Sequence, residues 1–175
     1  MTQILNTKKL IELYKLGYFP MAENSNADKI NLYKPNKRFI IPINTFHIPK
    51  KLLSEFKKNK FTFKINSDFK STINNCSLPR YEKDGTWINS IIKNTYIKLN
   101  EEGYAKSIEC IYKKEVVGGL YGIHINACFF GESMFSKISN TSKLSLLYLI
   151  SILKSNKFLL LDSQFFNKHL LQFGA

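Results

Sequence analysis

Residues 105–132, "AKSIECIYKKEVVGGLYGIHINACFFGE", contain the pattern that decides the fold. Three runs rich in apolar residues follow one another in this stretch, at 105–113, 116–125 and 127–132. The turn sequence "KKE" lies between the first two runs, and Asn126 lies between the second and the third. Closely spaced apolar runs with polar turns between them are typical of neighbouring antiparallel strands. The stretch therefore predicts a three-stranded meander.

The segments on either side of this meander have alternating helical and strand patterns. Apolar residues at helical spacing predict helices, whereas short apolar runs predict strands. After residue 60 the predicted order is a strand at 61–66, helices at 68–76 and 86–103, the meander, a helix at 140–155, a strand at 157–162 and a helix at 165–173. Ser67 is the expected N-terminal cap of the helix at 68–76. The polar run "SNTS" is the expected N-terminal cap of the helix at 140–155. The segment at 77–85 is expected to be a loop.

The first 60 residues have a different pattern from the rest of the chain. A helix over 7–17 is expected to end at its glycine, and two short strands bounded by prolines are expected at 30–35 and 38–42. We therefore expect a small N-terminal lobe at 1–60 and a main domain at 61–175. The order of elements in the main domain predicts an α+β fold with a mixed sheet and flanking helices. It resembles the acyltransferase fold of the N-acetyltransferase superfamily.

The composition is that of a folded chain with a sizeable core. Of the 175 residues, 44% are hydrophobic and 14% are aromatic. No stretch approaches the ~18 consecutive apolar residues of a membrane-spanning helix, and the first residues lack the apolar segment of a signal peptide. We therefore expect a cytoplasmic protein that does not enter a membrane. A monomer is the default expectation, since the sequence carries no signal for oligomeric state.

The cysteines and histidines do not have the spacing of metal ligands. The three cysteines contain no CxxC pair, and the three histidines contain no HxxxH pair; they are Cys76, Cys110, Cys128, His47, His124 and His169. We expect buried, reduced thiols and no bound metal.

The formal net charge of +13 favours a polyanionic partner, most often a nucleic acid. The basic residues cluster at 49–64, where apolar residues at helical spacing predict a short helix beginning near Pro49. The lysines that would project outward together from this region, to follow RNA phosphates, are Lys50, Lys51, Lys57, Lys58 and Lys60. An ordinary solvated helix face is the alternative.

A single carboxylate in the segment "CFFGESMFSKISNTSK", residues 128–143, points to a binding site. Glu132 lies between two bulky apolar pairs, and small polar residues follow them. A buried strand rarely contains a carboxylate, and a solvated loop rarely contains so many large apolar side chains. The segment therefore predicts the wall of a site for a ligand that is partly apolar and partly charged.

Six motifs together resemble one protein family. They are "YKLGYFPM" (14–21), "GTWI" (85–88), "GYAKSIE" (103–109), "VVGGLYG" (116–122), "FFGESMFS" (129–136) and "LLDSQ…HLLQFGA" (160–175). In order and spacing they resemble the bacterial leucyl/phenylalanyl-tRNA–protein transferases, over nearly the whole chain. Members of this family transfer Leu or Phe from a charged tRNA to the α-amine of a protein that begins with Arg or Lys, which marks that protein for degradation. Two departures are visible: Tyr33 stands where the family usually has Trp, and the family usually continues for tens of residues beyond "GA".

The resemblance implies a role for each candidate residue. An apolar pocket for the Leu or Phe side chain is expected from Leu120, Phe129, Met134 and Phe135, with Glu132 at its mouth to accept from the aminoacyl α-ammonium. Tyr33 and Trp87 are expected to stack on the terminal adenine. Asp162 and Gln164 are expected to position the amine and handle its proton, and Asn167 to bind the acceptor peptide. Each aromatic residue has core packing as its alternative role, and Asp162 has a cap of the following helix.

This chemistry requires no cofactor. An aminoacyl-tRNA ester is already activated, so its aminolysis needs neither ATP nor a metal, and proximity supplies part of the barrier reduction. A coenzyme-A-dependent N-acetyltransferase is a competing function, but the helix at 140–155 lacks the glycine-containing loop that would bind a pyrophosphate. A non-catalytic RNA-binding module and a degenerate transferase also compete with the transferase function.

Overall fold

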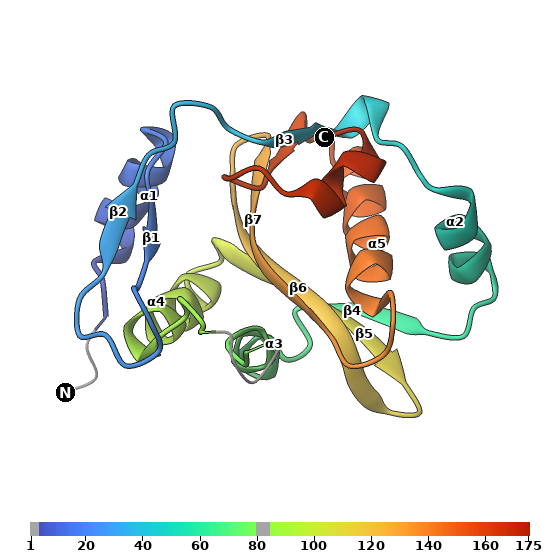
Figure 1. Cartoon of the computed structure of the whole chain (residues 1–175), viewed down its shortest axis with the longest axis horizontal. Coiled ribbons are helices and arrows are strands. Elements are labelled where there is room, and N and C mark those ends of the chain that lie inside the picture. Colours follow the sequence, from blue (N-terminus) through green and yellow to red (C-terminus); the bar gives the residue numbers. More distant parts are fainter. Residues whose placement is uncertain (1–3, 80–84) are drawn as a thin grey trace.

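A six-stranded mixed sheet forms the centre of the computed structural model, which describes residues 4–79 and 85–175 (Figure 1). In spatial order its strands are β3 (Ile40–Pro42), β8 (Leu160–Asp162), β7 (Cys128–Ser136), β6 (Glu115–Ile125), β5 (Ala105–Tyr112) and β4 (Thr62–Ile65). All neighbours are antiparallel except β7 and β8, which are parallel. The predicted meander is confirmed as β5, β6 and β7, and the predicted α+β class with a mixed sheet is also confirmed.

Helices cover both faces of the sheet, so that two apolar cores form. On one face lie α5 (Thr141–Ser155), α2 (Lys50–Lys57) and the short 3₁₀ helices η1 (Ile43–Thr45) and η2 (Lys168–Phe173). On the other face lie α1 (Thr7–Lys15), α3 (Phe69–Cys76) and α4 (Ser90–Glu101). Figure 1 shows α5 on the opposite side of β6 and β7 from α3 and α4. The chain thus has three layers, with the sheet in the middle.

Gly118 explains how closely α5 approaches the sheet. A Cβ atom at this position would lie 2.2 Å from the Thr141 Oγ1 atom, so only glycine fits beneath the first turn of the helix. The Thr141 hydroxyl also donates to the Val117 carbonyl at 2.9 Å. Because α5 is held against β6 at this point, it can form one wall of the site described below.

The N-terminal segment forms a small unit beside α4. The strands β1 (Phe19–Met21) and β2 (Asn31–Tyr33) form a separate antiparallel pair, and α1 packs on α4. However, β3 and α2 also precede residue 60, and β3 pairs with β8 in the main sheet while α2 packs on α5. The division at residue 60 therefore stays a prediction.

Several predicted boundaries and caps were wrong. Asp68, and not Ser67, caps α3, since its side chain accepts from the Ser71 N–H at 2.9 Å. Asn89 caps α4, so this helix begins four residues later than predicted. The N-cap residue of α5 is Asn140, within the predicted "SNTS" run, but its side chain makes no capping hydrogen bond; the Ser136 hydroxyl accepts from the Ser142 N–H at 2.9 Å instead.

Near the C-terminus, the predicted strand at 157–162 is shorter than expected and contains only 160–162. The last predicted helix forms only as the 3₁₀ helix η2. The predicted loop at 77–85 lies partly outside the described residues. None of the helices in residues 4–79 and 85–175 combines the length and apolar character needed to cross a membrane.

Candidate active site

A cavity opens where two parallel strands separate. The strand β8 pairs with only the first three residues of β7, from Cys128 to Phe130, and β7 then continues to Ser136 beside β6 alone. The cavity has a volume of about 710 Å³ and follows this unpaired part of β7. Its other walls come from α5, from the chain after β8 and from η2. Separated strands next to a helix therefore provide a binding space at the end of the sheet.

The cavity brings together the five residues predicted for the aminoacyl pocket. All five lie along its wall: Leu120, Phe129, Glu132, Met134 and Phe135. Leu120 lies opposite Met134 in the β6–β7 pair, and Leu146 and Leu149 of α5 extend the apolar wall. This part of the wall is thus apolar, with one carboxyl group facing the space. That these residues hold a Leu or Phe side chain stays a prediction.

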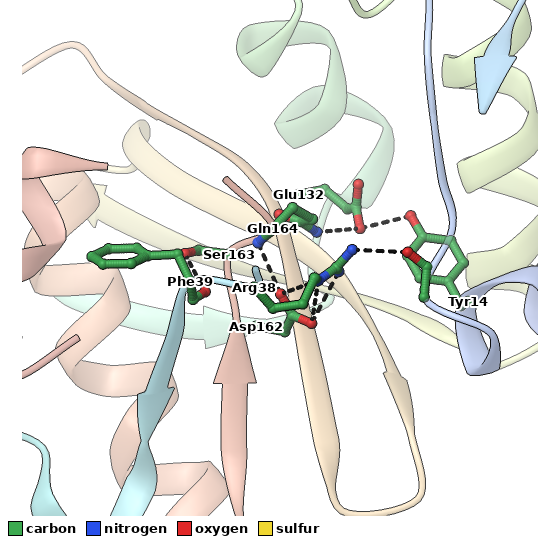
Figure 2. Close-up of polar contacts among 8 residues, drawn as sticks. Tyr14, Arg38, Phe39, Glu132, Asp162, Ser163 and Gln164 are labelled. Atoms are coloured by element: carbon green, nitrogen blue, oxygen red, sulfur yellow. Dashed lines mark hydrogen bonds and ion pairs between the residues drawn. The ribbon is translucent and has the colours of Figure 1, made fainter. Parts of the chain in front are cut away.

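Three neutral donors bind the Glu132 carboxyl group. Its Oε1 atom accepts from the Tyr14 hydroxyl at 2.7 Å and from the Gln164 Nε2 atom at 3.2 Å. Its Oε2 atom accepts from the Tyr96 hydroxyl at 3.1 Å, and the two tyrosine hydroxyls also hydrogen-bond to each other. Figure 2 shows Tyr14 and Gln164 approaching Glu132 from different elements. The sequence placed both tyrosines on inward helix faces but did not show that their hydroxyls meet this carboxyl group.

This environment places the titration of Glu132 near neutral pH. Burial raises the pKa of Glu132 to about 7, although the hydrogen bonds from Tyr14 and Tyr96 lower it. Burial also raises the pKa of both tyrosines well above the usual value, so their hydroxyls stay protonated and act as donors. A cationic group in the cavity would favour the ionised form of Glu132.

Asp162 has a very different environment, although Gln164 links it to Glu132. Asp162 is 6% exposed and forms an ion pair with Arg38, whose Nε atom lies 3.0 Å and 3.2 Å from the two carboxylate oxygens (Figure 2). The Arg38 Nη2 atom lies 2.9 Å from Asp162 Oδ2. Asp162 Oδ1 also accepts from the Gln164 N–H at 2.8 Å. Asp162 therefore lies behind Gln164, which lines the cavity, and is already paired with a cation.

The link between Asp162 and Gln164 does not arise from strand alternation, as the sequence had suggested. Gln164 has φ of 62°, in the left-handed region, so the chain turns immediately after β8. The alternative role of Asp162 as a helix cap is wrong, because Asn167 caps η2 by accepting from the His169 N–H at 3.0 Å. Asn167 also lines the cavity, and its predicted contact with an acceptor peptide stays a prediction.

The two residues predicted to stack on adenine lie in different places. Trp87 lines the cavity, as do Leu78 and Pro79. Tyr33 does not line it; this residue is 37% exposed, and its ring lies 6.2 Å from the Phe19 ring, measured between centroids. Their joint contact with an adenine stays a prediction.

The predicted phosphate-binding lysines lie away from the cavity. All five are exposed on α2 or just after it: Lys50, Lys51, Lys57, Lys58 and Lys60. Figure 1 shows α5 between α2 and the sheet. Two other lysines, Lys137 and Lys143, line the cavity itself. The sequence interpretation missed them because it treated "SKISNTSK" only as a helix start.

No cluster of three or more His, Cys, Asp or Glu side chains suited to a metal occurs in residues 4–79 and 85–175. Burial raises the pKa of Cys110 and of Cys128 to about 12, so these thiols stay protonated at neutral pH. The described part of the cavity is lined by carboxyl, amide, hydroxyl and ammonium groups, and also by the His169 imidazole and the Cys76 thiol.

Comparison of the sequence with known proteins gives matches to one family. The family model for leucyl/phenylalanyl-tRNA protein transferase matches residues 40–175. A protein of Zymomonas mobilis named leucyl/phenylalanyl-tRNA–protein transferase is 39% identical over 175 residues, which are 100% of this chain and 65% of that protein. Proteins with the same name from Phenylobacterium zucineum and Maricaulis maris are 38% and 40% identical over 97% and 96% of this chain. The chain covers 77% and 78% of those two proteins.

Similarity to solved structures extends to the fold. A crystal structure of FemX has a TM-score of 0.56 at 12% identity and covers 93% of this chain and 61% of that one. The C-terminal domain of a putative lysylphosphatidylglycerol synthetase from Agrobacterium fabrum has a TM-score of 0.50 at 8% identity, covering 89% of this chain and 50% of that one. The arrangement of sheet and helices therefore occurs in other proteins whose sequences are very different.

Proposed function

Because this chain belongs to the leucyl/phenylalanyl-tRNA–protein transferase family, we propose that it transfers Leu or Phe from a charged tRNA to the α-amine of an acceptor protein. We further propose that the preferred acceptors begin with Arg or Lys. The observation that carries the proposal is Glu132, a carboxyl group bound only by neutral donors beside the apolar part of the cavity wall.

The aminoacyl group has two features that match this cavity. Its side chain is apolar, and the wall around Leu120 and Met134 would remove it from water. Its α-ammonium is cationic, and Glu132 would accept its hydrogen bonds in the ionised form. Lys137 and Lys143 at the same cavity provide positive charge for the terminal phosphates of the tRNA.

The acceptor amine would approach from the side of Gln164 and Asn167. The neutral amine attacks the ester carbonyl carbon, so that a C–N bond forms and the C–O bond to the ribose breaks. The attacking nitrogen loses one proton, and the ribose oxygen gains one. Gln164 would hold the amine, and Asp162 would stabilise the developing ammonium through Gln164, so no other reactant is required.

A transfer assay with varied donors and acceptors tests this function. The purified chain is incubated with labelled Phe-tRNA, Leu-tRNA or acetyl-coenzyme A and with peptides that differ only in a first residue of Arg, Lys or Glu. We expect transfer from both charged tRNAs to the Arg and Lys peptides, little transfer to the Glu peptide and none from acetyl-coenzyme A. Acetyl transfer alone would favour an N-acetyltransferase, and binding of Phe-tRNA without transfer would favour an RNA-binding module.

A further inference from the structure

Arg38 connects the candidate active site with the N-terminal segment. It lies just before β3, and its Nε and Nη2 atoms contact the Asp162 carboxylate at 2.9–3.2 Å. Its Nη1 atom donates to the Gly17 carbonyl at 3.0 Å, and its guanidinium group lies 5.2 Å from the centroid of the Phe19 ring. The guanidinium group is thus fixed from three sides, as Figure 2 shows in part.

The end of α1 touches both carboxyl groups of the site. Gly17 follows this helix in the left-handed conformation, with φ of 86°, and its carbonyl accepts from Arg38. Tyr14, in the last turn of the same helix, donates to Glu132. One continuous series of contacts therefore runs from Gly17 through Arg38, Asp162 and Gln164 to Glu132 and back to α1.

We propose that Arg38 is a positioning residue that keeps Asp162 ionised and aimed at the Gln164 backbone, so that Asp162 acts on the acceptor amine only through Gln164. Asp162 is then not the counter-ion of the basic side chain of the acceptor. The functional half of this inference rests on the transferase activity proposed above, whereas the ionisation of Asp162 does not.

The surroundings of Asp162 require such a cation. Asp162 is nearly enclosed, and β7 places a second carboxyl group, Glu132, and the Cys128 thiol near it. A buried carboxylate without a partner would take up a proton, and a like charge nearby favours the same outcome. The Arg38 Nε atom donates to both carboxylate oxygens, and Nη2 adds an ion-pair contact to Oδ2, so the guanidinium group restricts the orientation of the carboxylate. Asp162 Oδ1 accepts from the Gln164 backbone N–H and so holds the backbone of Gln164, whose side chain donates to Glu132.

The first test measures the ionisation of Asp162 directly, without any substrate. Carboxyl ¹³C NMR spectra are recorded at about pH 7 for the parental chain and for Arg38→Met, Arg38→Lys and Lys37→Met, with Asp162→Asn to assign the resonance. We expect Arg38→Met to move the Asp162 carboxyl resonance towards that of a protonated carboxyl group, because the buried carboxylate then lacks its cationic partner. Arg38→Lys should reverse most of this change, because it keeps the charge. Lys37→Met removes an exposed charge next in the chain and should leave the resonance unchanged.

The second test separates positioning from acceptor binding. Single-turnover transfer from pre-bound Phe-tRNA is measured at saturating and limiting concentrations of an Arg-initiated peptide. We expect Arg38→Met to lower the maximal rate at least ~10-fold with little change in the peptide concentration for half-maximal rate, and Arg38→Lys to recover part of that rate. In an Asp162→Asn background, Arg38→Met should add little further loss, since both changes affect one unit.

Each outcome decides a different part of the inference. An unchanged Asp162 carboxyl resonance in Arg38→Met would overturn the ionisation role, whether or not the parental chain transfers amino acids. A defect confined to peptide affinity would instead make Asp162 the counter-ion of the acceptor. Thermal unfolding of each variant controls for misfolding, and if Arg38→Met does not fold, the spectra of Arg38→Lys and of Arg38→Gln give the same comparison.

Discussion

Two carboxyl groups lie close together in this site and have opposite surroundings. Glu132 accepts only from neutral donors, whereas Asp162 is paired with the Arg38 guanidinium group. Burial dominates at Glu132 and raises its pKa to about 7. Carboxyl groups in such different environments can have different roles at one pH. Glu132 can gain or lose a proton near neutral pH, whereas Asp162 is held in an ion pair.

The raised pKa of Glu132 predicts an unusual pH dependence of stability. The folded chain keeps this proton up to about pH 7, whereas the unfolded chain loses it near pH 4.5. Between these values the unfolded state binds fewer protons, so the contribution of Glu132 to stability falls as pH rises. Relative to Glu132→Gln, the parental chain should lose roughly 1–3 kcal/mol of unfolding free energy over this range, since one pKa unit corresponds to about 1.4 kcal/mol.

Urea unfolding of both proteins at pH 5 and at pH 8 measures this difference. Glu115→Gln, which changes an exposed glutamate on β6, is the matched control and should follow the parental curve at both pH values. If the parental chain and Glu132→Gln keep the same stability difference at pH 5 and pH 8, Glu132 does not titrate in this range.

Substitution of Asp162 should slow the chemical step. We expect Asp162→Asn to lower the single-turnover transfer rate by ~10²-fold or more, within the range typical of general acid–base groups. Its affinity for Phe-tRNA should hardly change, because Asp162 lies behind Gln164 and away from the lysines of α2. Gln164→Ala should act in the same direction, and the double variant should be little slower than the slower single variant.

Filter binding of Phe-tRNA, run beside the kinetic assay, separates the two effects. A parental transfer rate in Asp162→Asn would show that Asp162 has no part in the reaction. A defect that consists wholly of lost tRNA binding would contradict the assignment equally.

At the scale of helices and strands, the sequence predicts the elements that have a clear local pattern of apolar residues. The strands β5, β6 and β7 have clear apolar runs, and α5 has apolar residues all along its length. The strand β1 was missed, because three residues that include Pro20 carry too little pattern for a prediction. The segment before η2 was read as helical from its apolar residues, but Phe165 and Phe166 are 46% and 69% exposed.

The contrast between local sequence pattern and long-range packing also explains which site residues the sequence predicts. Glu132 is indicated by its polarity within an apolar segment, whereas the roles of Asp162 and Gln164, at and just after the end of an apolar strand, are implied by the family resemblance. Their partners are distant in sequence: Tyr14 is 118 residues from Glu132, and Arg38 is 124 residues from Asp162. Local spacing cannot indicate which polar group meets which carboxyl group, because those pairings depend on how the N-terminal segment packs against the sheet.

The basic helix α2 allows a test at the level of one element. Changing Lys50, Lys51, Lys57 and Lys58 to Ala should weaken Phe-tRNA binding and reduce its salt dependence. If all four contact phosphates, the slope of log K against log salt should decrease in magnitude by about 3, since each contact contributes ~0.7–0.9.

A control with four other exposed lysines has the same net charge as this variant: Lys8, Lys9, Lys29 and Lys154 changed to Ala. It should keep most of the parental slope. Equal slopes for the two quadruple variants would show that only net charge matters, and an unchanged slope in the α2 variant would place the phosphate contacts elsewhere, with Lys137 and Lys143 as the next candidates.

At the scale of the whole molecule, the site depends on both layers of helices. The helix α5 forms an apolar wall from one face of the sheet, while Tyr14 of α1 and Tyr96 of α4 bind Glu132 from the other. The cavity exists because β7 continues after β8 has ended. We infer that this gap holds the aminoacyl group of the charged tRNA, which is the central claim of the account.

Filling the gap is the most direct test of that claim. Leu120 is 3% exposed and lines the cavity opposite Met134, so Leu120→Trp should occupy the space intended for the side chain of Phe. Leu120→Met keeps nearly the same volume and serves as the control. The measurement is labelled Phe transfer from Phe-tRNA to an Arg-initiated peptide, with thermal unfolding of each variant to establish that it folds. We predict that the parental chain and Leu120→Met transfer Phe and that a folded Leu120→Trp does not; transfer by Leu120→Trp at the parental rate would contradict the account.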